Sequence, residues 1–574
     1  MYKTAFQFYS ILLFIGIQFT GFSQENFVRN ISPHHEKRID SLFNEWNDPS
    51  KPGVIMALLN NNELVYLKSF GSTQLETSKP ILRDTRFQLA AMSKHFTAFG
   101  ILLLEEKGKL SLEDDARNII KQLSHFNHPI RIIDLLGQSD GIFDFNALKY
   151  ISGRSDEIKI SNQLVLDMVE RQKELSFIPG TDFVDAGTST SILLLAEIIK
   201  EVSGKSFADF MREEVFAPIG MKNTLFIESK DSHLTNIANP YIKVDDGFAD
   251  GEIFDDNYGV TNLFSTIEDL VKWELNMLNP VVGSRALYEK LNAEVILENG
   301  RKFAVPQGQL THGQQYIHME RDLSSTYHLG QYGGYASSMF KFPKPGFISI
   351  VLSNNGDDYN GYLGVISSHI LLEDVYEEPT VLKAEALPIQ PISNQDLEAL
   401  TGEYWDERGG LYRTIRLKND TLQYVRNSGY ASALYHIGNR RFQMLTGFDD
   451  KIFLTFKGEG DSKSMCYEGG GSEQIVFEKF EFKEEVGQWY EAYVGAYYSD
   501  LLQVGYSIDY EDGALTIKNL HTAKVKLIRI KDELFNGNQW FMRSIEFQKD
   551  DASNVIGFKT RMQEVDGVQF KKVR

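Results

Sequence analysis

The last third of the chain contains an internal repeat with a fixed spacing of 93 positions. Both copies consist of short stretches that alternate polar and apolar residues, such as YRTIRL and YSIDY, separated by turns rich in Gly, Asn and Asp. This period of two is typical of half-buried strands, so each copy is predicted to form a small antiparallel β-barrel, over residues 394–482 and 487–574. Four pairs of residues share the spacing: Gly402 and Gly495, Leu422 and Leu515, Phe442 and Phe535, and Phe477 and Phe570.

A proline-bearing segment separates the repeat from the rest of the chain. Residues 377–393 read EEPTVLKAEALPIQPIS and are predicted to be a linker. Since 574 residues are too many for one core, residues 27–376 are expected to form a separate domain that mixes helices and strands. Residues 53–71 predict a hairpin, residues 94–107 and 191–202 predict helices, and residues 347–354 predict a buried strand.

Charge and cysteine content exclude several classes of function. A formal net charge of −20 argues against nucleic acid, whose phosphates would be repelled. The only cysteine, Cys466, can form no internal disulfide. The 12 histidines include no H-E-x-x-H and no cysteine pair accompanies them, so neither a metal nor another cofactor is expected.

The first residues have the pattern of a targeting segment. Lys3 precedes an apolar run from Phe6 to Phe22, and a small residue, Ser23, follows that run. Residues 1–23 are therefore predicted to be a cleavable signal peptide, which favours a secreted or periplasmic protein. A membrane anchor is the weaker interpretation, because polar residues interrupt the run and no basic residues follow it. No later stretch is long and apolar enough to span a bilayer, so no integral membrane segment is expected after cleavage.

Seven stretches of the first domain follow one another in a distinctive order. They are KPGVIMALLNNNELVYLKSFG (51–71), DTRFQLAAMSKHFTAFGILLLEEKGKL (84–110), HPIRIIDLLGQSDGI (128–142), PGTDF (179–183), EVSGKSF (201–207), PIGMKNT (218–224) and LFSTIEDLVKW (263–273). With these motifs, residues 35–375 resemble the serine β-lactamase and penicillin-binding-protein superfamily, especially class C-like serine hydrolases. The resemblance implies an α+β fold, in which an antiparallel sheet is flanked by helices and joined by a helical subdomain. Two barrels after such a domain also resemble the architecture of D-aminopeptidases.

The family's nucleophile is a serine that opens a helix, three residues before a lysine on the same face. The flanking motifs place Lys94 at the lysine position, which puts Ala91 at the serine position. A methyl group cannot form an acyl-enzyme. Ser93 directly precedes Lys94 and points to another side of the helix, so it is not expected to replace the nucleophile.

The second family element, Tyr-x-Asn, is also altered. Residues 184–191 read VDAGTSTS in its place. Counting forward from PGTDF puts Asp185 at the tyrosine position, and counting back from EVSG puts Gly187 there. Neither register supplies a phenol, although Asp185 could act as a base. A lone carboxylate is more often a turn or helix-cap residue.

The third element, H-x-G on a closing strand, is present as His328-Leu329-Gly330. The glycine would let a ligand approach the backbone, or would serve close packing in a hairpin. A further match to S-x-x-K, SMFK at 338–341, lies in a predicted strand, where Ser338 and Lys341 would fall on opposite faces.

These features predict a secreted pseudoenzyme, in which the hydrolase fold remains and the acylation chemistry is lost. Its vestigial pocket would contain Ala91, Ser93, Lys94, Asp185, Gly187, His328 and Gly330. It would bind a small peptide, a peptidoglycan fragment or a glycan. One alternative is an active esterase, amidase or D-aminopeptidase rebuilt around Ser93, Lys94, Asp185 or His328. Another is that the barrels carry the function by binding a carbohydrate or a partner.

Overall fold

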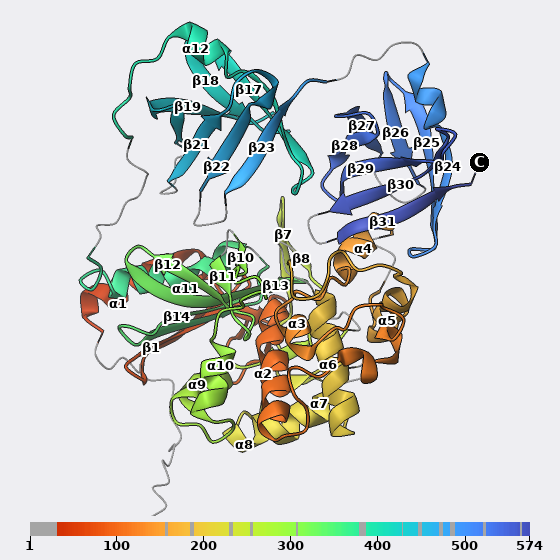
Figure 1. The fold of residues 1–574 in the computed structure, drawn as a ribbon. Helices are drawn as coiled ribbons and strands as arrows, with labels where there is room; N and C mark the ends of the chain where they lie inside the picture. Colours follow the sequence, from red (N-terminus) through yellow and green to blue (C-terminus); the bar gives the residue numbers. More distant parts are fainter. Residues whose placement is uncertain are drawn as a thin grey trace, which may run out of the picture.

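The first domain is built on an eight-stranded antiparallel sheet with helices on both faces (Figure 1). The computed structural model describes residues 31–154, 159–183, 189–228, 234–252, 257–305, 308–356, 358–377, 386–427, 429–445, 451–469, 474–482, 488–519, 524–562 and 565–573. In spatial order the strands are β10 (Ala304–Val305), β11 (Gly308–Leu310), β12 (Tyr316–Glu320), β13 (Leu323–Tyr332), β14 (Tyr335–Phe342), β15 (Phe347–Ser353), β1 (Val54–Asn60) and β2 (Glu63–Phe70).

Three small sheets connect this sheet to the helices. They are β3 (Ser72–Gln74) with β4 (Lys79–Pro80), β5 (Phe87–Gln88) with β9 (Leu263–Ser265) and β6 (Leu225–Phe226), and β7 (Tyr241–Val244) with β8 (Gly247–Asp250). The helices of this domain are α1 (Pro33–Leu42), α2 (Ser93–Glu106), α3 (Ile132–Leu136), α4 (Phe145–Ile151), α5 (Asn162–Arg171), α6 (Ser189–Ser203), α7 (Phe207–Phe210), α8 (Ala217–Ile219), α9 (Ile267–Leu278), α10 (Arg285–Leu291) and α11 (Asp358–Leu371).

Helix α2 lies at the centre of the helical part of the domain. It contacts α6 and α10, and every residue from His95 to Leu104 is buried. Its sequence has no continuous polar face, and a helix that is apolar on all sides is typical of a protein core. On the other side of the sheet, α11 covers β14 and β15, and α1 packs against α11.

The two copies of the repeat form two closed barrels of eight strands each. The first contains β16 (Gly402–Asp406), β17 (Leu411–Lys418), β18 (Thr421–Val425), β19 (Ala431–Gly438), β20 (Arg441–Met444), β21 (Ile452–Lys457), β22 (Ser464–Glu468) and β23 (Ile475–Phe480), preceded by helix α12 (Asn394–Glu398). The second contains β24 (Gly495–Ser499), β25 (Val504–Glu511), β26 (Ala514–Lys518), β27 (Val525–Arg529), β28 (Leu534–Gln539), β29 (Met542–Lys549), β30 (Val555–Met562) and β31 (Val565–Lys572).

Equivalent residues of the repeat have the same role in the first strand of each barrel. Gly402 and Gly495 begin β16 and β24 with φ of 136° and 147°, a backbone conformation that favours glycine. Two residues later, Tyr404 and Tyr497 are buried and donate hydrogen bonds to carbonyl oxygens four residues upstream, at 2.8 and 2.6 Å. In both barrels, the glycine and the tyrosine hydrogen bond therefore fix the backbone at the start of the first strand.

The second barrel packs directly on the first domain. The Tyr506 hydroxyl donates to the carbonyl oxygen of Ile151, at the end of α4, over 2.6 Å. The Arg171 Nε donates to the carbonyl oxygen of Leu501 over 3.0 Å. Apolar side chains of the second barrel and of the helical part of the first domain form one continuous buried cluster, so the two share a core.

The predicted α+β architecture with two small antiparallel barrels is confirmed. The helix predicted at 191–202 begins earlier, at Ser189, and the strand predicted at 347–354 is β15. Ser338 and Lys341 lie on opposite faces of β14 as predicted, since Ser338 lies against Gly364 of α11 and Lys341 pairs with Glu274 of α9. The predicted signal peptide lies outside the described residues, as do residues 378–385 of the predicted linker.

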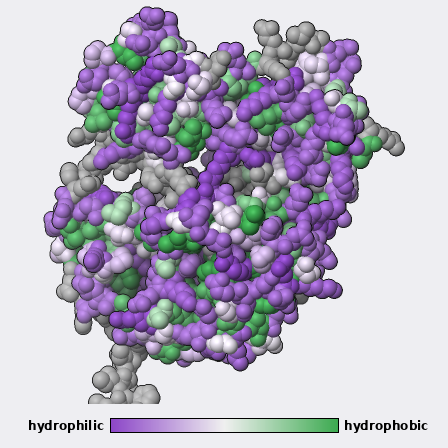
Figure 2. Space-filling view, viewed as in Figure 1, coloured by the Kyte–Doolittle hydropathy of each residue, from purple (hydrophilic) through white to green (hydrophobic). Residues whose placement is uncertain are grey.

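Hydrophilic residues cover most of the face shown in Figure 2, and hydrophobic residues are scattered among them. Among the residues that the structure describes, no helix is long and apolar enough to cross a membrane.

The buried ion pair between α9 and the sheet gives a test of this packing. Lys341 and Glu274 lie 2.9 Å apart, with side chains only 11% and 2% exposed. Glu274→Gln leaves the Lys341 ammonium buried without its counter-charge, so the free energy of unfolding should fall by about 3–5 kcal/mol in urea titrations. Glu268→Gln is the matched control on the same helix. Glu268 is 41% exposed and 3.7 Å from Lys272, so its loss should cost less than about 1 kcal/mol. Equal effects of the two changes would contradict this assignment.

Candidate functional site

A cavity of about 290 Å³ lies where the start of α2 meets strand β13. Ala91 comes from the turn before α2 and Lys94 from the first turn of that helix. His328 and Leu329 come from β13, and Tyr362 from α11. The remaining lining residues are Gln138, Leu310, Gln314, Tyr316 and Tyr327. The cavity therefore brings together the first and third sequence elements, which are more than 200 positions apart in the chain.

The turn that carries Ala91 is held from two sides. Residues Ala90–Met92 form a 3-10 turn that runs directly into α2. The N–H of the preceding Leu89 donates to the carbonyl oxygen of Leu263, and the Ser337 hydroxyl donates to the carbonyl oxygen of Leu89 over 2.7 Å. Ala90 has φ of +48°, a left-handed conformation that is uncommon outside glycine. These contacts fix Ala91 at the mouth of the helix.

Gly330 lets strand β13 come close to that turn. A Cβ atom at this position would lie 2.2 Å from the carbonyl oxygen of Leu89 and 3.2 Å from the backbone nitrogen of Ala91. No side chain fits in that space, so glycine is required by packing here. The H-x-G element therefore sets the distance between β13 and the start of α2.

Lys94 lines the cavity one helical turn after Ala91. Among the described residues, its amine has no hydrogen-bond partner. Burial lowers the pKa of Lys94, and the carboxylate of Asp144 acts in the opposite direction. Asp144 caps α4 through the N–H groups of Asn146 and Ala147 and also accepts from the N–H of Ser189. Burial raises the pKa of Asp144, and Lys94 acts in the opposite direction, so the two groups favour each other's charged form.

His328 forms part of the cavity wall as a neutral imidazole. Its side chain is buried, and its Nδ1 has no hydrogen-bond partner among the described residues. Burial holds the pKa of His328 well below its ordinary value of 6.5, and the positive charges of Lys94 and Lys341 act in the same direction. At neutral pH it can accept a hydrogen bond without carrying charge.

Ser93 does not line the cavity. It is fully buried, and its hydroxyl oxygen accepts a hydrogen bond from the N–H of Leu263 at 3.2 Å. The side chain thus ties α2 to β9 and has a structural role. Asp185 and Gly187 fall outside the described residues, so the second element has no described position in the site.

Sequence reasoning missed most of the polar lining of the cavity. Gln138 and Gln314 both have left-handed backbones, with φ of 53° and 60°, and the Gln138 amide donates to the Gln314 side-chain oxygen. Gln314 in turn donates to the carbonyl oxygen of Leu136 at 2.8 Å. Gln138 lies in the quoted stretch LLGQSDG, but its partner comes from a distant loop that no local pattern identifies.

Two tyrosines form an apolar and aromatic side of the cavity. Tyr316 and Tyr327 lie on paired strands with ring centroids 6.0 Å apart. Burial raises the pKa of Tyr316 to about 12 and raises that of Tyr327 further. Both phenols are therefore protonated near neutral pH and can donate hydrogen bonds.

Comparisons with known proteins agree with this geometry. The model of the Beta-lactamase family matches residues 39–362. Penicillin-binding protein 4* of Bacillus subtilis (strain 168) is 24% identical over 464 residues, which cover 77% of this chain and 98% of that protein. The D-aminopeptidase of Brucella anthropi is 26% identical over 259 residues, covering 45% of this chain and about half, 48%, of that protein.

Two solved structures show the same fold. The octameric penicillin-binding protein homologue from Pyrococcus abyssi has a TM-score of 0.52 at 21% identity, covering 78% of this chain and 99% of that chain. SurE with D-Leu has a TM-score of 0.50 at 17% identity, covering 78% of this chain and 100% of that chain.

The neutral state of His328 has a consequence for stability below neutral pH. In the unfolded chain a histidine takes up a proton near pH 6.5, whereas folded His328 does not until a much lower pH. Acidification below pH 6.5 therefore favours unfolding, by about 1.4 kcal/mol per pH unit for this group. His328→Gln should reduce the slope of unfolding free energy against pH by about that amount in the range just below pH 6. Identical slopes in urea titrations would show that His328 is protonated in the folded state.

Proposed function

Because the chain belongs to the Beta-lactamase family, we propose that it is a secreted or periplasmic member that binds a small peptide in the family's cleft without acylation. The targeting pattern of residues 1–23 supports the location. The residues that line the cavity support the absence of acylation, and their polar groups support a peptide as the ligand.

The observation that carries this proposal is the absence of an acylating group from the cavity lining. Among the described residues that line it, there is no serine, threonine or cysteine. Ala91 supplies a methyl group at the mouth of α2, where acyl transfer would need a hydroxyl. The half-buried tyrosines Tyr316 and Tyr327 are poor substitutes, because their raised pKa disfavours the phenolate that would have to attack.

The polar lining suits a peptide. The amides of Gln138 and Gln314 and the phenols of the tyrosines can bond peptide N–H and C=O groups, and the Lys94 amine can bond a carboxylate. Names of relatives agree with this class of ligand: a penicillin-binding protein, D-aminopeptidases, and SurE in a structure with D-Leu. The carbohydrate option for this cleft has less support, since none of these names refers to a sugar.

The geometry gives no support to an active site rebuilt around Ser93. Its hydroxyl is engaged with the N–H of Leu263 and is fully buried away from the cavity lining. Nucleophilic attack would need α2 to rotate, which the close packing of its buried residues opposes.

Restoring the family serine tests whether only the nucleophile is missing. Ala91→Ser should give no turnover of nitrocefin or of a nitrophenyl ester above that of the unchanged protein. The reason is that the sequence at 184–188 supplies no tyrosine to assist Lys94 in moving the serine proton. Ala91→Ser/Ser93→Ala is the matched control, which separates a new activity from one that uses Ser93. Turnover by both variants would show that the rest of the catalytic machinery is intact.

Filling the cavity tests the proposed binding. D-alanyl-D-alanine is a suitable small probe, and calorimetry should show saturable binding to the full chain. Ala91→Leu should weaken this binding by about tenfold or more, because the added side chain enters the cavity. Ala286→Leu, at an exposed position of α10, should leave it unchanged. No saturable binding by the unchanged chain, or equal affinity of the two variants, would refute the assignment of this ligand to the cleft.

A further inference from the structure

A second cleft, of about 430 Å³, lies between the two barrels. We call it the inter-barrel cleft. One wall comes from the start of β17 and the two residues after β18, and the other from β27 and the β28–β29 hairpin. Its lining residues are Leu411, Tyr412, Arg413, Arg426, Asn427, Ile528, Asn536, Gly537, Asn538, Gln539, Trp540 and Arg543. Clefts between domains are frequent places for ligands.

The charge of this cleft is opposite to that of the chain. Three arginines line it and no aspartate or glutamate does, although the chain has a formal net charge of −20. The guanidinium groups of Arg413 and Arg426 lie 5.6 and 5.2 Å from the centroid of the same ring, that of Tyr424. Both guanidinium groups are therefore held around one ring in the wall of the cleft, where a bound anion would meet positive charge.

Neutral groups hold both arginines in place. Arg413 donates to the Tyr424 hydroxyl at 2.8 Å and to the side-chain oxygen of Asn427 at 3.0 Å. Arg426 donates to the Ser432 hydroxyl at 3.0 Å. Neither arginine has a carboxylate partner among the described residues. Their positive charge is thus positioned before a ligand arrives, which reduces the entropy cost of binding an anion.

Asp406 is the carboxylate whose charge acts on Tyr424. It accepts a hydrogen bond from the N–H of Arg408 and does not line the cleft.

An exposed aromatic ring and several amides complete the cleft. Trp540 is 46% exposed, and its ring packs edge-on against Tyr150 of α4 with centroids 4.6 Å apart. Asn427 donates to the side-chain oxygen of Asn536 at 3.1 Å, which joins the two walls. A flat ring suits the C–H face of a sugar, amides suit its hydroxyls, and arginine suits an acidic group.

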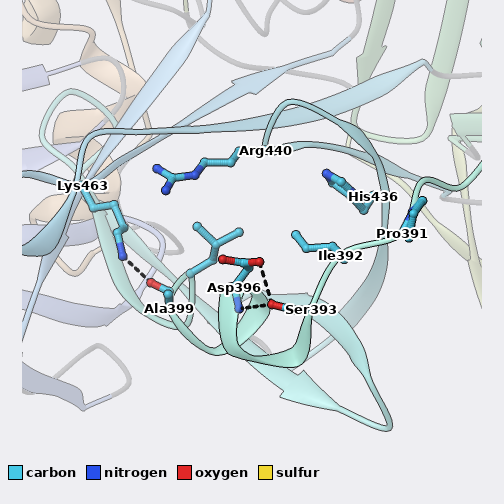
Figure 3. Close-up of a pocket in the computed structure, with 9 residues that line it drawn as sticks. Pro391, Ile392, Ser393, Asp396, Ala399, His436, Arg440 and Lys463 are labelled. Atoms are coloured by element: carbon cyan, nitrogen blue, oxygen red, sulfur yellow. Dashed lines mark hydrogen bonds between the residues drawn. The ribbon is translucent and has the colours of Figure 1, made fainter.

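A larger cavity, of about 530 Å³, between α12 and the first barrel has mixed charge and does not show the same preference. Figure 3 shows that Asp396 shares it with Arg440 and Lys463. The Lys463 amine donates to the carbonyl oxygen of Ala399, so part of its hydrogen-bonding capacity is already used. Charge and exposed aromatic surface coincide in the inter-barrel cleft and not here.

We propose that the inter-barrel cleft binds an acidic saccharide, with its acid on Arg413 and Arg426 and a sugar face on Trp540. This site is separate from the cavity at Ala91 and does not depend on the function proposed for it. The barrels would then hold an anionic glycan while the first domain presents its own cleft.

Calorimetry on the full chain tests the proposal with four probes. Tetragalacturonate carries carboxylates, glucose 6-phosphate carries a phosphate, and the methyl ester of tetragalacturonate lacks the charge. Inorganic phosphate carries charge without a sugar. We expect one or both of the acidic sugars to bind, at least about tenfold more tightly than the methyl ester and inorganic phosphate, with affinity falling as salt rises. No binding of either acidic sugar, or equal binding of the ester or of free phosphate, would overturn the proposal.

Variants assign that binding to the cleft. Arg413→Gln/Arg426→Gln should weaken it by about tenfold or more, whereas Arg416→Gln, at an exposed position of the same strand, should leave it unchanged. Gln539→Glu provides an independent arm, because it adds a negative charge to the cleft and removes neither arginine. It too should weaken binding by about tenfold. Unchanged affinity in a folded Gln539→Glu variant would place the binding elsewhere and overturn the assignment.

Discussion

The close approach of strand β13 to the turn before α2 determines the shape of the family cleft. Gly330 makes this approach possible, since a Cβ there would lie 2.2 Å from the carbonyl oxygen of Leu89. The Ser337 hydroxyl holds that same carbonyl from β14. Ala91, Lys94 and His328 face one cavity because these backbone contacts fix the two elements against each other. The framework of the cleft thus rests on glycine packing and backbone hydrogen bonds, which need no catalytic group.

The side chains of the cleft supply hydrogen-bonding groups but no nucleophile among the described lining residues. A lysine with a lowered pKa, a neutral histidine and protonated phenols make it well supplied with hydrogen-bonding groups. An acyl-enzyme also needs a nucleophile, and Ala91 supplies none. An alanine in place of a serine leaves the volume and most of the polar lining of a cleft in place. The proposed binding role for this member of the Beta-lactamase family rests on that difference.

Local sequence patterns predicted those strands and helices that are determined by residues close together in the chain. The barrels followed from a repeat in which Gly402 and Gly495 adopt the same left-handed backbone, and α2 followed from an apolar run that ends before Gly108. The orientation of Ser93 also follows from helical geometry, and its hydroxyl bonds the N–H of Leu263. Contacts between distant segments were not predictable in this way. Gln138 meets Gln314 across 176 positions, and the arginines of the inter-barrel cleft meet Trp540 only after both barrels have folded and packed.

The central claim is that no group in the cleft can be acylated or phosphonylated, and intact-protein mass spectrometry after exposure to a fluorophosphonate tests it most directly. Such a reagent modifies activated serines irrespective of which substrate the enzyme prefers. The protein is predicted to keep its unmodified mass, while an active serine hydrolase treated in parallel gains one adduct. A single stoichiometric adduct on this chain that disappears in Ser93→Ala would contradict the claim and identify a working nucleophile beside Lys94.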